Sequence, residues 1–568
     1  MTSTSDNRFR SKIAALRRRS GQVGGVCRFV AKSGVMAQAG IRGALVALNE
    51  LRQGRGGPPL LYRINAANTP SRLAVVCGER RISFAELDER ADRIAGALHA
   101  ELGIKAGDAV VVMTPNCLEV LELQAAVMRL GASLVFVSWR STESELSFLA
   151  DDCGARLIVS AAQTTPTALR VAESLPSLSE RSVVCLGGAS VGGRSYRDLL
   201  KGEPYAPSER ASAARLIVYT SGTTGKPKGA VREFPVWAQL SLLSFVAETP
   251  IRSDDRHLVV CPMYHSTAFA FASFTMLVAG RLVIMPRFEA EQVLETIERE
   301  RITTTAMVPT MLHRLLALPD EVFARYDTSS LRVVFSGGAP LTGDLAARFM
   351  QRFGHVLYNF YGATETGIST LATPEELLLS PGTIGHVVPG NELRLLTEQG
   401  TPAAEGCTGE LYVRNDMLIA RYHQRPDATR SSMRDGFFSV GDLAHFDAHG
   451  LLHIDGRKRD MNISGGVNVY PAELEEVLCQ HPAVMDAAVI GAADPEWGET
   501  VCAFLVLNPS QPTSEDEIHA FCRDRMQTAK RPRRLIFVDA LPKNPTGKTV
   551  KTELRSWLDQ APPHSTKV

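Results

Sequence analysis

The residues best suited to chemistry in this sequence form one stretch, Tyr219–Ala230, which reads YTSGTTGKPKGA. It follows an apolar run, Leu216–Val218, that predicts the end of a strand. Hydroxyl groups and glycine-rich backbone can close around an anion, and lysines add the charge that a polyphosphate requires. A Gly/Ser/Thr linker has a similar composition but does not require this order. We therefore expect a phosphate-binding loop made of Thr220, Ser221, Gly222, Thr223, Thr224, Gly225, Lys226 and Lys228.

This loop closely resembles the nucleotide-binding motif of the adenylate-forming superfamily, which comprises acyl-CoA synthetases, luciferases and the adenylation domains of nonribosomal peptide synthetases. The resemblance covers roughly residues 60–555, in the family's order of motifs, and is strongest to fatty acyl-CoA synthetases. It implies an α/β fold, with a large N-terminal domain of parallel and mixed sheets flanked by helices and a small, mobile α+β C-terminal domain. It also implies ATP, Mg²⁺ and coenzyme A as cofactors.

Two more loops of small residues, Ser336–Pro340 and Tyr361–Glu365, each follow a β-rich run. Ligands of open α/β sheets bind beyond the carboxyl ends of the strands, where these loops fall. We expect the glycine-containing loop Ser336–Pro340 to lie along the adenine ring and Tyr361 to stack on the other side of that ring. Thr364 would offer a hydroxyl to the phosphates, and Glu365 a carboxylate oxygen to Mg²⁺. The remaining nucleotide-binding residues of these loops are Gly337, Gly338, Ala339, Pro340, Gly362 and Ala363.

Matches to the family also assign roles near the end of the large domain. Asp442 corresponds to the family's ribose-binding aspartate, whose two oxygens can accept from both ribose hydroxyls. Arg457 would reach the ribose or a phosphate. Arg459 stands at the hinge, where members of the family usually carry Asp or Lys, and a hinge residue needs only to absorb a backbone rotation.

Two further segments belong to the predicted small domain. The turn of Ser464, Gly465 and Gly466 matches the segment that lines the pantetheine tunnel, where glycine lets a thin thiol arm pass close to the backbone. A simple hairpin turn is the alternative. Lys548, about 90 residues beyond the hinge, matches the catalytic lysine of the family. We expect it to serve the first half-reaction.

On the substrate side, the segment CPMYHSTAF resembles the part of the family that lines the acyl and thiol approach. We place Tyr264, His265 and Phe269 there, with His265 as a candidate for proton transfer, although a lone histidine beside apolar residues is often structural. Trp237 is a candidate gate for an acyl channel or a core residue. Residues 265–276 are apolar and contain no Lys, Arg or Asp, which favours a hydrophobic acid over an amino acid.

The elements that must position these residues follow an alternating pattern. Apolar runs at Ala74–Cys77, Ala109–Met113, Ser133–Val137 and Leu157–Ser160 predict strands, and the segments between them predict helices. Such alternation indicates parallel sheets with helices on their faces. Gly54–Pro59 predicts a linker, and Val137–Ser141 departs from the family's Pro-Leu-Asn-Pro, which we interpret as a local structural variant. The expected domains are an extension at 1–55, a large domain at 56–457 and a small domain at 458–568.

Composition limits the other classes of protein. The ten cysteines show no ligand spacing and favour reduced thiols, hence a cytoplasmic location. The net charge is only +1, but residues 1–55 contain eleven Lys or Arg against two acidic residues. We expect a small-molecule carboxylic acid as partner and no nucleic acid. In residues 1–55, an amphipathic helical pattern with a basic face indicates peripheral membrane association, a helix packed on the large domain, or a disordered tail.

The family's reaction is a two-step ligation in which an acid is activated as acyl-AMP and then transferred to coenzyme A. We expect a medium- to very-long-chain fatty acid or another lipid acid as substrate, with an aryl acid as the alternative. Three other activities remain open: an adenylate ligase that loads a carrier protein, a luciferase-like monooxygenase, and a degenerate, non-enzymatic member. The last would have lost Thr364, Glu365, Asp442 or Lys548, and all four are present.

Overall fold

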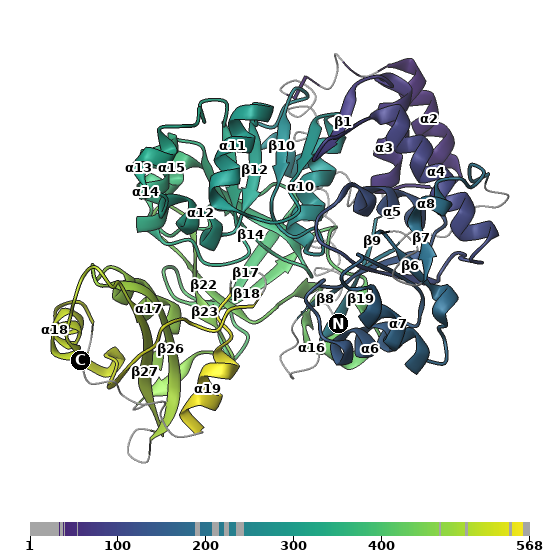
Figure 1. Ribbon diagram of the computed structural model, residues 1–568. Coiled ribbons are helices and arrows are strands. Elements are labelled where there is room, and N and C mark those ends of the chain that lie inside the picture. The colour runs from purple at the N-terminus through teal and green to yellow at the C-terminus, as the bar shows by residue number, and fades with distance from the viewer. Residues whose placement is uncertain are drawn as a thin grey trace, which may run out of the picture.

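The computed structural model describes residues 33–34, 38, 40–53, 55–187, 193–206, 215–220, 227–234, 243–464, 467–494, 498–526, 528–544 and 548–559. They form four β-sheets and the helices around them (Figure 1). Three sheets are built from residues before Lys458, and the fourth, yellow-green in Figure 1, from residues after it. The predicted α/β fold, with a large N-terminal part and a smaller C-terminal part, is confirmed.

The first sheet has eight strands in the order β19-β9-β8-β4-β3-β5-β6-β7, with a parallel centre. Strands β3 and β4 are buried along their whole length, as is typical of parallel strands covered on both faces. The strands are β3 (Ala109–Met113), β4 (Ser133–Phe136), β5 (Ala155–Ser160), β6 (Val183–Cys185), β7 (Arg194–Ser195), β8 (Arg215–Thr220), β9 (Lys228–Glu233) and β19 (Arg421–Tyr422). The helices of this region are α4 (Phe84–Ala100), α5 (Leu118–Arg129), α6 (Glu143–Asp152), α7 (Thr165–Ser174) and α8 (Tyr196–Leu199).

The second sheet has nine strands in the order β16-β15-β14-β13-β12-β10-β11-β1-β2. Its strands are β1 (Leu73–Cys77), β2 (Arg80–Ser83), β10 (Arg256–Val259), β11 (Arg281–Ile284), β12 (Thr304–Met307), β13 (Val333–Ser336), β14 (Leu357–Ala363), β15 (Gly367–Ala372) and β16 (His386–Val387). Its helices are α10 (Ser266–Leu277), α11 (Ala290–Glu300), α12 (Pro309–Leu316), α13 (Asp320–Phe323), α14 (Gly343–Phe353) and α15 (Pro374–Leu379).

The third and fourth sheets are smaller. The third contains β17 (Glu392–Leu396), β18 (Gly409–Arg414), β20 (Met433–Arg434), β21 (Phe437–Phe438), β22 (Asp442–Phe446) and β23 (Leu452–Arg457), with helix α16 (Pro426–Ser431) nearby. The fourth contains β24 (Asn462–Ser464), β25 (Val467–Val469), β26 (Val484–Asp494), β27 (Gly498–Leu507) and β28 (Arg534–Phe537). Its helices are α17 (Pro471–Cys479), α18 (Glu515–Arg525) and α19 (Lys551–Asp559).

Strand pairing explains why distant motifs meet. Strands β8 and β9 form an antiparallel pair in which Thr220 lies opposite Lys228, so the predicted phosphate loop connects their ends. Strands β13 and β14 run parallel as neighbours, so the loops that follow them leave the same edge of the second sheet. Asp442 begins β22 directly opposite Arg457, the last residue of β23. Each of these motifs therefore lies at a strand end.

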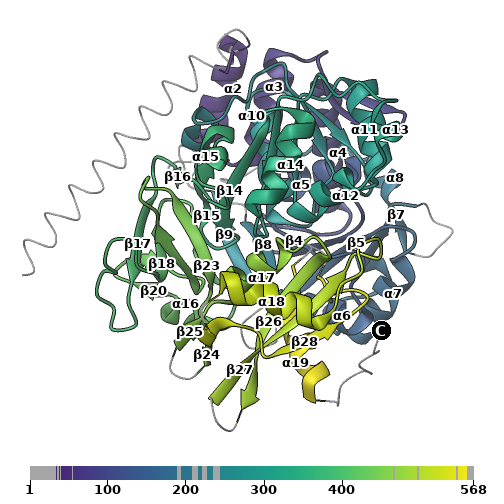
Figure 2. The same ribbon diagram turned by 90° about the vertical axis from the view of Figure 1, so that its left-hand side faces the viewer.

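One sequence-based expectation is wrong. Gly54–Pro59 predicts a linker, but helix α3 (Pro58–Asn68) begins inside this segment. Proline is well suited to the first turn of a helix because its fixed φ is helical and the N–H that it lacks would have no partner there. Gly57 supplies the sharp entry with φ +88°, a value that favours glycine. Helix α2 (Ile41–Arg52) precedes α3 and lies against it in both views (Figures 1 and 2). Within the described ranges, no helix is long and apolar enough to span a membrane.

Close packing behind the glycine loop gives a prediction for Gly337. A β-carbon on this residue would lie 2.6 Å from the carbonyl oxygen of Phe360, so the Gly337→Ala variant must displace backbone. Forcing extra volume into a packed site costs about 1–3 kcal/mol. We expect differential scanning calorimetry to show a lower midpoint for this variant. An unchanged midpoint would mean that the loop can shift freely.

Candidate active site

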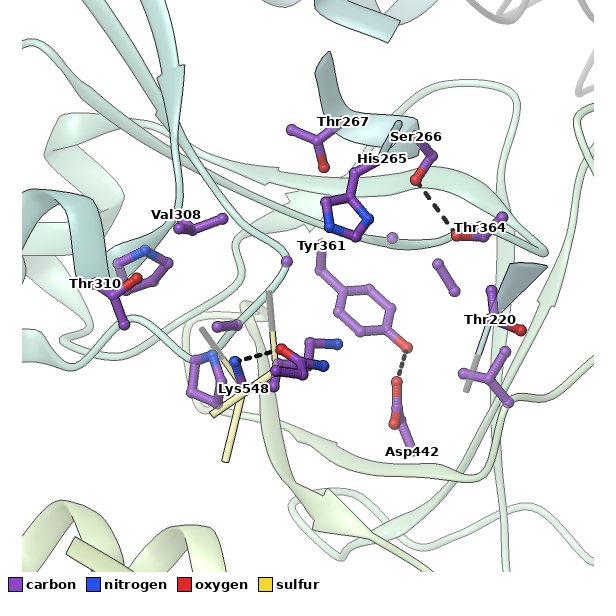
Figure 3. A pocket seen from close by; sticks show the side chains of 18 of the residues that line it. Thr220, His265, Ser266, Thr267, Val308, Thr310, Tyr361, Thr364, Asp442 and Lys548 are labelled. Atoms are coloured by element: carbon purple, nitrogen blue, oxygen red, sulfur yellow. Dashed lines mark hydrogen bonds between the residues drawn. The ribbon is translucent and has the colours of Figure 1, made fainter. Parts of the chain in front are cut away.

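A cavity of about 3260 Å³ opens where the four sheets meet. Each sheet contributes to its wall: Thr220 ends β8, Tyr361 lies in β14, Asp442 begins β22 and Val484 begins β26. Figure 3 shows that the side chains of Thr220, Tyr361, Asp442 and Lys548 surround one space. Residues more than 300 positions apart in the chain therefore line a single cleft.

Glu365 is held rigidly at the wall of this cleft. Its Oε1 accepts hydrogen bonds from the hydroxyls of Thr220 (3.1 Å) and Tyr422 (3.0 Å), and only 6% of the residue is exposed. Both bonds end on the same oxygen, which leaves Oε2 for another ligand. The described residues contain no cluster of three or more His, Cys, Asp or Glu that could hold a metal alone. Mg²⁺ commonly takes one or two carboxylates together with substrate phosphates, and Glu365 suits that use.

Thr364, the residue before Glu365, is positioned by a different element. Its hydroxyl lies 3.3 Å from the Ser266 hydroxyl at the start of helix α10 (Figure 3). Two neighbouring residues are thus fixed from opposite sides, Thr364 by α10 and Glu365 by strands of the first sheet.

The carboxylate of Asp442 already has two partners. Its Oδ2 accepts from the Tyr361 hydroxyl (2.6 Å), and its Oδ1 accepts from Arg457 Nε (2.8 Å). Burial, followed by the charge of Asp442, raises the pKa of Tyr361 far above its usual value, so the hydroxyl stays a donor. Each carboxylate oxygen has two lone pairs, so each can accept one more bond from a ligand. The predicted ribose contacts therefore remain available on both oxygens.

Lys548 reaches the cleft from the C-terminal part of the chain. The loop before it is closed by two bonds: the Lys548 N–H donates to Asn544 Oδ1, and the Asn544 N–H donates to the Lys548 carbonyl, both at 2.9 Å. The ammonium remains in contact with solvent inside the cleft, but protein surrounds it. This loss of hydration, with repulsion from Arg457 and Arg459, lowers the Lys548 pKa to about 8, while Asp442 and Glu365 act in the opposite direction.

His265 precedes α10 and lies above Tyr361 in Figure 3. Its Nε2 is buried without a hydrogen-bond partner. Burial, together with the charge of Lys548, lowers its pKa to about 4, so the imidazole is neutral near pH 7. Its neighbour Tyr264 contacts it with a ring-centroid distance of 4.4 Å, and the Tyr264 hydroxyl is also buried without a partner. His265 Nε2 and the Tyr264 hydroxyl are therefore two buried polar atoms in the cavity wall that a ligand could bind.

One side of the cavity is apolar. The ring of Phe269 packs 6.5 Å from that of Phe136 and 6.2 Å from that of Phe234, and all three line the cavity together with Leu60 and Leu61 of α3. All five of these side chains are apolar, so this part of the cavity wall carries no charge. Phe269 therefore belongs to the apolar wall of the cavity.

The segment Val137–Ser141, which the sequence suggests is a local structural variant, lines the cavity. The Arg140 guanidinium lies 4.5 Å from the centre of the Trp139 ring, a cation–π arrangement at the cavity wall. The loop follows strand β4, which pairs in parallel with β8, so it leaves the sheet at the edge where β8 ends with Thr220.

Sequence reasoning missed three residues that organise the site. Tyr422 donates to Glu365, and Ser266 contacts Thr364. Arg232 in β9 donates to the carbonyl oxygens of Thr364 and Met417, both at 2.5 Å. Burial lowers the Arg232 pKa to about 10, opposed by Glu365, so the group stays charged. A signal for Arg232 was present in the sequence, because an arginine directly after the apolar residues of a short strand is unusual. The sequence gives no such signal for Tyr422 or Ser266.

The remaining predicted residues are placed as follows. Gly338, Ala339 and Pro340 line the cavity with Gly362 and Ala363, as do Lys228, Arg457 and Arg459. Gly337 packs against Phe360 behind them. Strands β24 and β25 form an antiparallel pair that brackets the predicted tunnel turn. Outside the described residues lie Ser221, Gly222, Thr223, Thr224, Gly225, Lys226, Trp237, Gly465 and Gly466, and the side chain of Ser464.

Comparisons with known proteins agree with this geometry. Residues 62–423 match the model of the AMP-binding enzyme family, and residues 473–548 match that of the AMP-binding enzyme C-terminal domain. The chain is 33% identical to the long-chain-fatty-acid–CoA ligase FadD13 of Mycobacterium tuberculosis, over 85% of this chain and 94% of that protein. It is 34% identical to feruloyl-CoA synthase of an Amycolatopsis species, over 89% and 99% of the two chains.

Among solved structures, the ATP-bound MatB of Rhodopseudomonas palustris superimposes with a TM-score of 0.80 at 31% identity. The match covers 89% of this chain and all of that one. The order of the strand-end motifs, the cleft that they share and these matches lead to one conclusion: the chain belongs to the AMP-binding enzyme family of adenylate-forming enzymes.

Proposed function

We propose that this protein is an AMP-forming acid–CoA ligase that acts on hydrophobic carboxylic acids. A carboxylate oxygen attacks the α-phosphorus of ATP, which gives acyl-AMP and pyrophosphate. The thiol of coenzyme A then attacks the acyl carbonyl carbon and expels AMP. The observation that supports this proposal most directly is the meeting of Lys548, Asp442 and Glu365 in one cleft.

In the first step, the chain must bring two anions together, so its main tasks are charge neutralisation and alignment. Lys548 supplies a positive charge in a poorly hydrated site, where an ion pair is stronger than in water. Asp442 would hold the ribose and Thr364 would donate to a phosphate. Glu365 would hold Mg²⁺ through Oε2, and the metal would neutralise phosphate charge. His265 is neutral near pH 7 and therefore adds no charge beside the carboxylate.

In the second step, the small domain, proposed at residues 458–568, would rotate about Arg459. Around this pivot, Lys458 Nζ binds Glu410 (3.0 Å), the Lys458 N–H donates to the Gly441 carbonyl oxygen (2.8 Å), and Arg459 Nε lies 3.9 Å from Asp460. Rotation would withdraw Lys548 and bring the turn between β24 and β25 to the cleft. In the family, this turn lines the pantetheine tunnel, so one small domain serves both half-reactions.

For the substrate, we infer a medium- to very-long-chain fatty acid or another lipid acid. The aromatic wall formed by Phe136, Phe234 and Phe269, extended by Leu60 and Leu61, supports this inference because it offers only apolar contacts to a chain. The two buried polar atoms of Tyr264 and His265 favour the second candidate, an aryl acid with a polar substituent. A carrier protein in place of coenzyme A is the alternative acceptor.

A panel of acids separates these substrates. We expect the purified protein, with ATP, Mg²⁺ and coenzyme A, to form AMP and thioester fastest with aliphatic acids, because the apolar wall gains contacts as the chain lengthens. Mass spectrometry of the products is the measurement. Faster turnover of hydroxylated aryl acids would identify the aryl alternative, and AMP release without thioester would indicate another acceptor.

Replacing Lys548 tests the division of labour between the half-reactions. We expect Lys548→Ala to suppress carboxylate-dependent ATP–pyrophosphate exchange by at least about 100-fold, since it removes a positive charge that would stabilise the transition state. Transfer of a preformed acyl-adenylate to coenzyme A should change little. The matched control is Lys551→Ala. Lys551 lies three residues after Lys548, and its ammonium binds Glu475 (2.7 Å). Equal loss in both assays would contradict the role of Lys548.

The lowered Lys548 pKa predicts a pH dependence. The charged form is needed and is lost as pH rises through about 8. We therefore expect kcat/KM for ATP in the exchange assay to fall above pH 8, because this parameter reports the free enzyme. Bound phosphates would raise the pKa, so the fall in kcat should occur at higher pH. Lys548→Arg should be slower but show no decline between pH 8 and 9.5, since arginine keeps its charge.

Arg232 should act as a positioning residue. Leaving two buried carbonyls without a donor costs about 1–3 kcal/mol, so Arg232→Met should lower kcat for adenylation by about 5- to 150-fold. Because the Glu365 loop is loosened, the Mg²⁺ concentration for half-maximal activity should also rise. Arg232→Lys should recover only part of both losses. Arg215→Met, which removes an exposed pair with Glu233 in the same hairpin, is the control. An unchanged Mg²⁺ dependence in folded Arg232→Met would disprove the role.

A further inference from the structure

Helix α2 carries an unusual number of exposed apolar side chains. Ile41 is 79% exposed, Leu45 61%, Leu48 47% and Leu51 43%. Across the ranges that the structure describes, only five other large hydrophobic side chains are comparably exposed, and they are spread over four other segments. A contiguous apolar patch on a surface marks a site of interaction.

The spacing places these four side chains on one face. At about 100° per residue, Ile41, Leu45, Leu48 and Leu51 fall within an arc of about 120°. The exposed Arg52 falls inside this arc, and the exposed Arg42 lies about 60° beyond its edge. An apolar stripe flanked by long cationic side chains is the pattern of a helix that lies in a membrane interface.

The opposite face of α2 is turned inward and is neutralised. Glu50, the only acidic residue of the helix, is 8% exposed, and its carboxylate lies 3.6 Å from Arg55 and 3.9 Å from Arg63. The Gly43 N–H donates to Asn68 Oδ1 at the end of α3 (2.8 Å). The exposed face therefore presents apolar and cationic groups with no carboxylate from the helix itself.

Helix α2 is separated from the apolar side of the cavity by a single helix, α3. Helix α2 packs on α3, and Pro58, Leu60 and Leu61 of α3 line the cavity. Both views show the two helices together at the edge of the large domain, away from the C-terminal part (Figures 1 and 2). A surface bound at α2 would leave the C-terminal part free to move.

We propose that the Ile41–Leu51 stripe docks on an anionic lipid bilayer. The occupant is identified by charge complementarity: residues 1–55 hold eleven Lys or Arg against Asp6 and Glu50, and Glu50 is paired inward. Clustered basic residues bind the anionic surface, and the four apolar side chains enter the interface. Docking could also bring the enzyme to a substrate held in the same membrane. This second idea rests on the proposed function, because only a lipid acid would be drawn from a bilayer.

Liposome co-sedimentation of the full chain tests docking without ATP, acid or coenzyme A, so its outcome does not depend on catalysis. The vesicles are phosphatidylcholine alone or with about a third phosphatidylglycerol. We expect strong binding only to the anionic vesicles and reduced binding in 0.5 M NaCl. The triple variant Ile41→Gln, Leu45→Gln, Leu48→Gln should bind at least about tenfold more weakly, since glutamine keeps the helix but not the apolar face.

Two controls keep the result unambiguous. The variant Leu378→Gln, Leu379→Gln removes two exposed leucines from α15, of 49% and 58% exposure, and should bind like the unmodified protein. Arg42→Gln, Arg52→Gln should weaken binding only to anionic vesicles. Turnover of a soluble medium-chain acid should be unchanged in all variants, so loss of that activity would bear on the proposed function and not on docking.

Three outcomes would overturn the proposal. The first is no vesicle binding by the unmodified protein, and the second is equal binding by the triple variant. The third is a concentration-dependent dimer, seen by light scattering, that the triple variant abolishes, because the stripe would then be an interface between two copies.

Discussion

Repulsion between a carboxylate and a triphosphate is the constraint that the cleft must overcome. Its central cation, Lys548, comes from the C-terminal part of the chain and meets Asp442 and Glu365 from the large domain. Loss of hydration lowers the Lys548 pKa to about 8, so a smaller fraction of the lysine is charged near neutral pH. The same poorly hydrated surroundings strengthen the attraction between the charged form and an anion. A cation delivered by a separate part of the chain can also be removed, which is what a second step at the same cleft would require.

The proposed nucleotide-binding residues and the proposed hinge are joined by short-range contacts. Asp442 accepts from Tyr361 and from Arg457, and Arg457 stands two residues before Arg459. Strands β22 and β23 pair Asp442 with Arg457, so a ligand that competes for the Asp442 carboxylate acts directly on the strand that leads into the hinge. On the other side of the cleft, Arg232 and Tyr422 fix the backbone and carboxylate around Glu365. Both carboxylates of the site, Glu365 and Asp442, are therefore positioned by hydrogen bonds from two other side chains.

The apolar features of the molecule are also connected. The aromatic wall of the cavity continues into α3, and α3 supports α2, whose outer face is apolar and basic. The inward pairing of Glu50 with Arg55 and Arg63 gives α2 two distinct faces, one for the protein and one for the proposed bilayer. The proposed hydrophobic substrate and the proposed bilayer would therefore be served by two adjacent helices, α3 and α2.

The sequence alone determined the family, the α/β fold and the identity of the strand-end motifs. Strands such as Ala109–Met113, and helices such as Phe84–Ala100, follow from local apolar patterns. Local patterns also misled: Gly54–Pro59 resembles a linker, yet Pro58 begins a helix, because proline suits both settings.

Only the tertiary structure revealed Arg232 and Tyr422 around Glu365, the inward turn of Glu50 and the place of Trp139 and Arg140 at the cavity. Several of these contacts join residues far apart in the chain: 57 positions for Tyr422 and Glu365, 132 for Arg232 and Thr364, and 185 for Arg232 and Met417. A local pattern specifies which face of an element is apolar, but packing between elements decides which polar group each side chain meets.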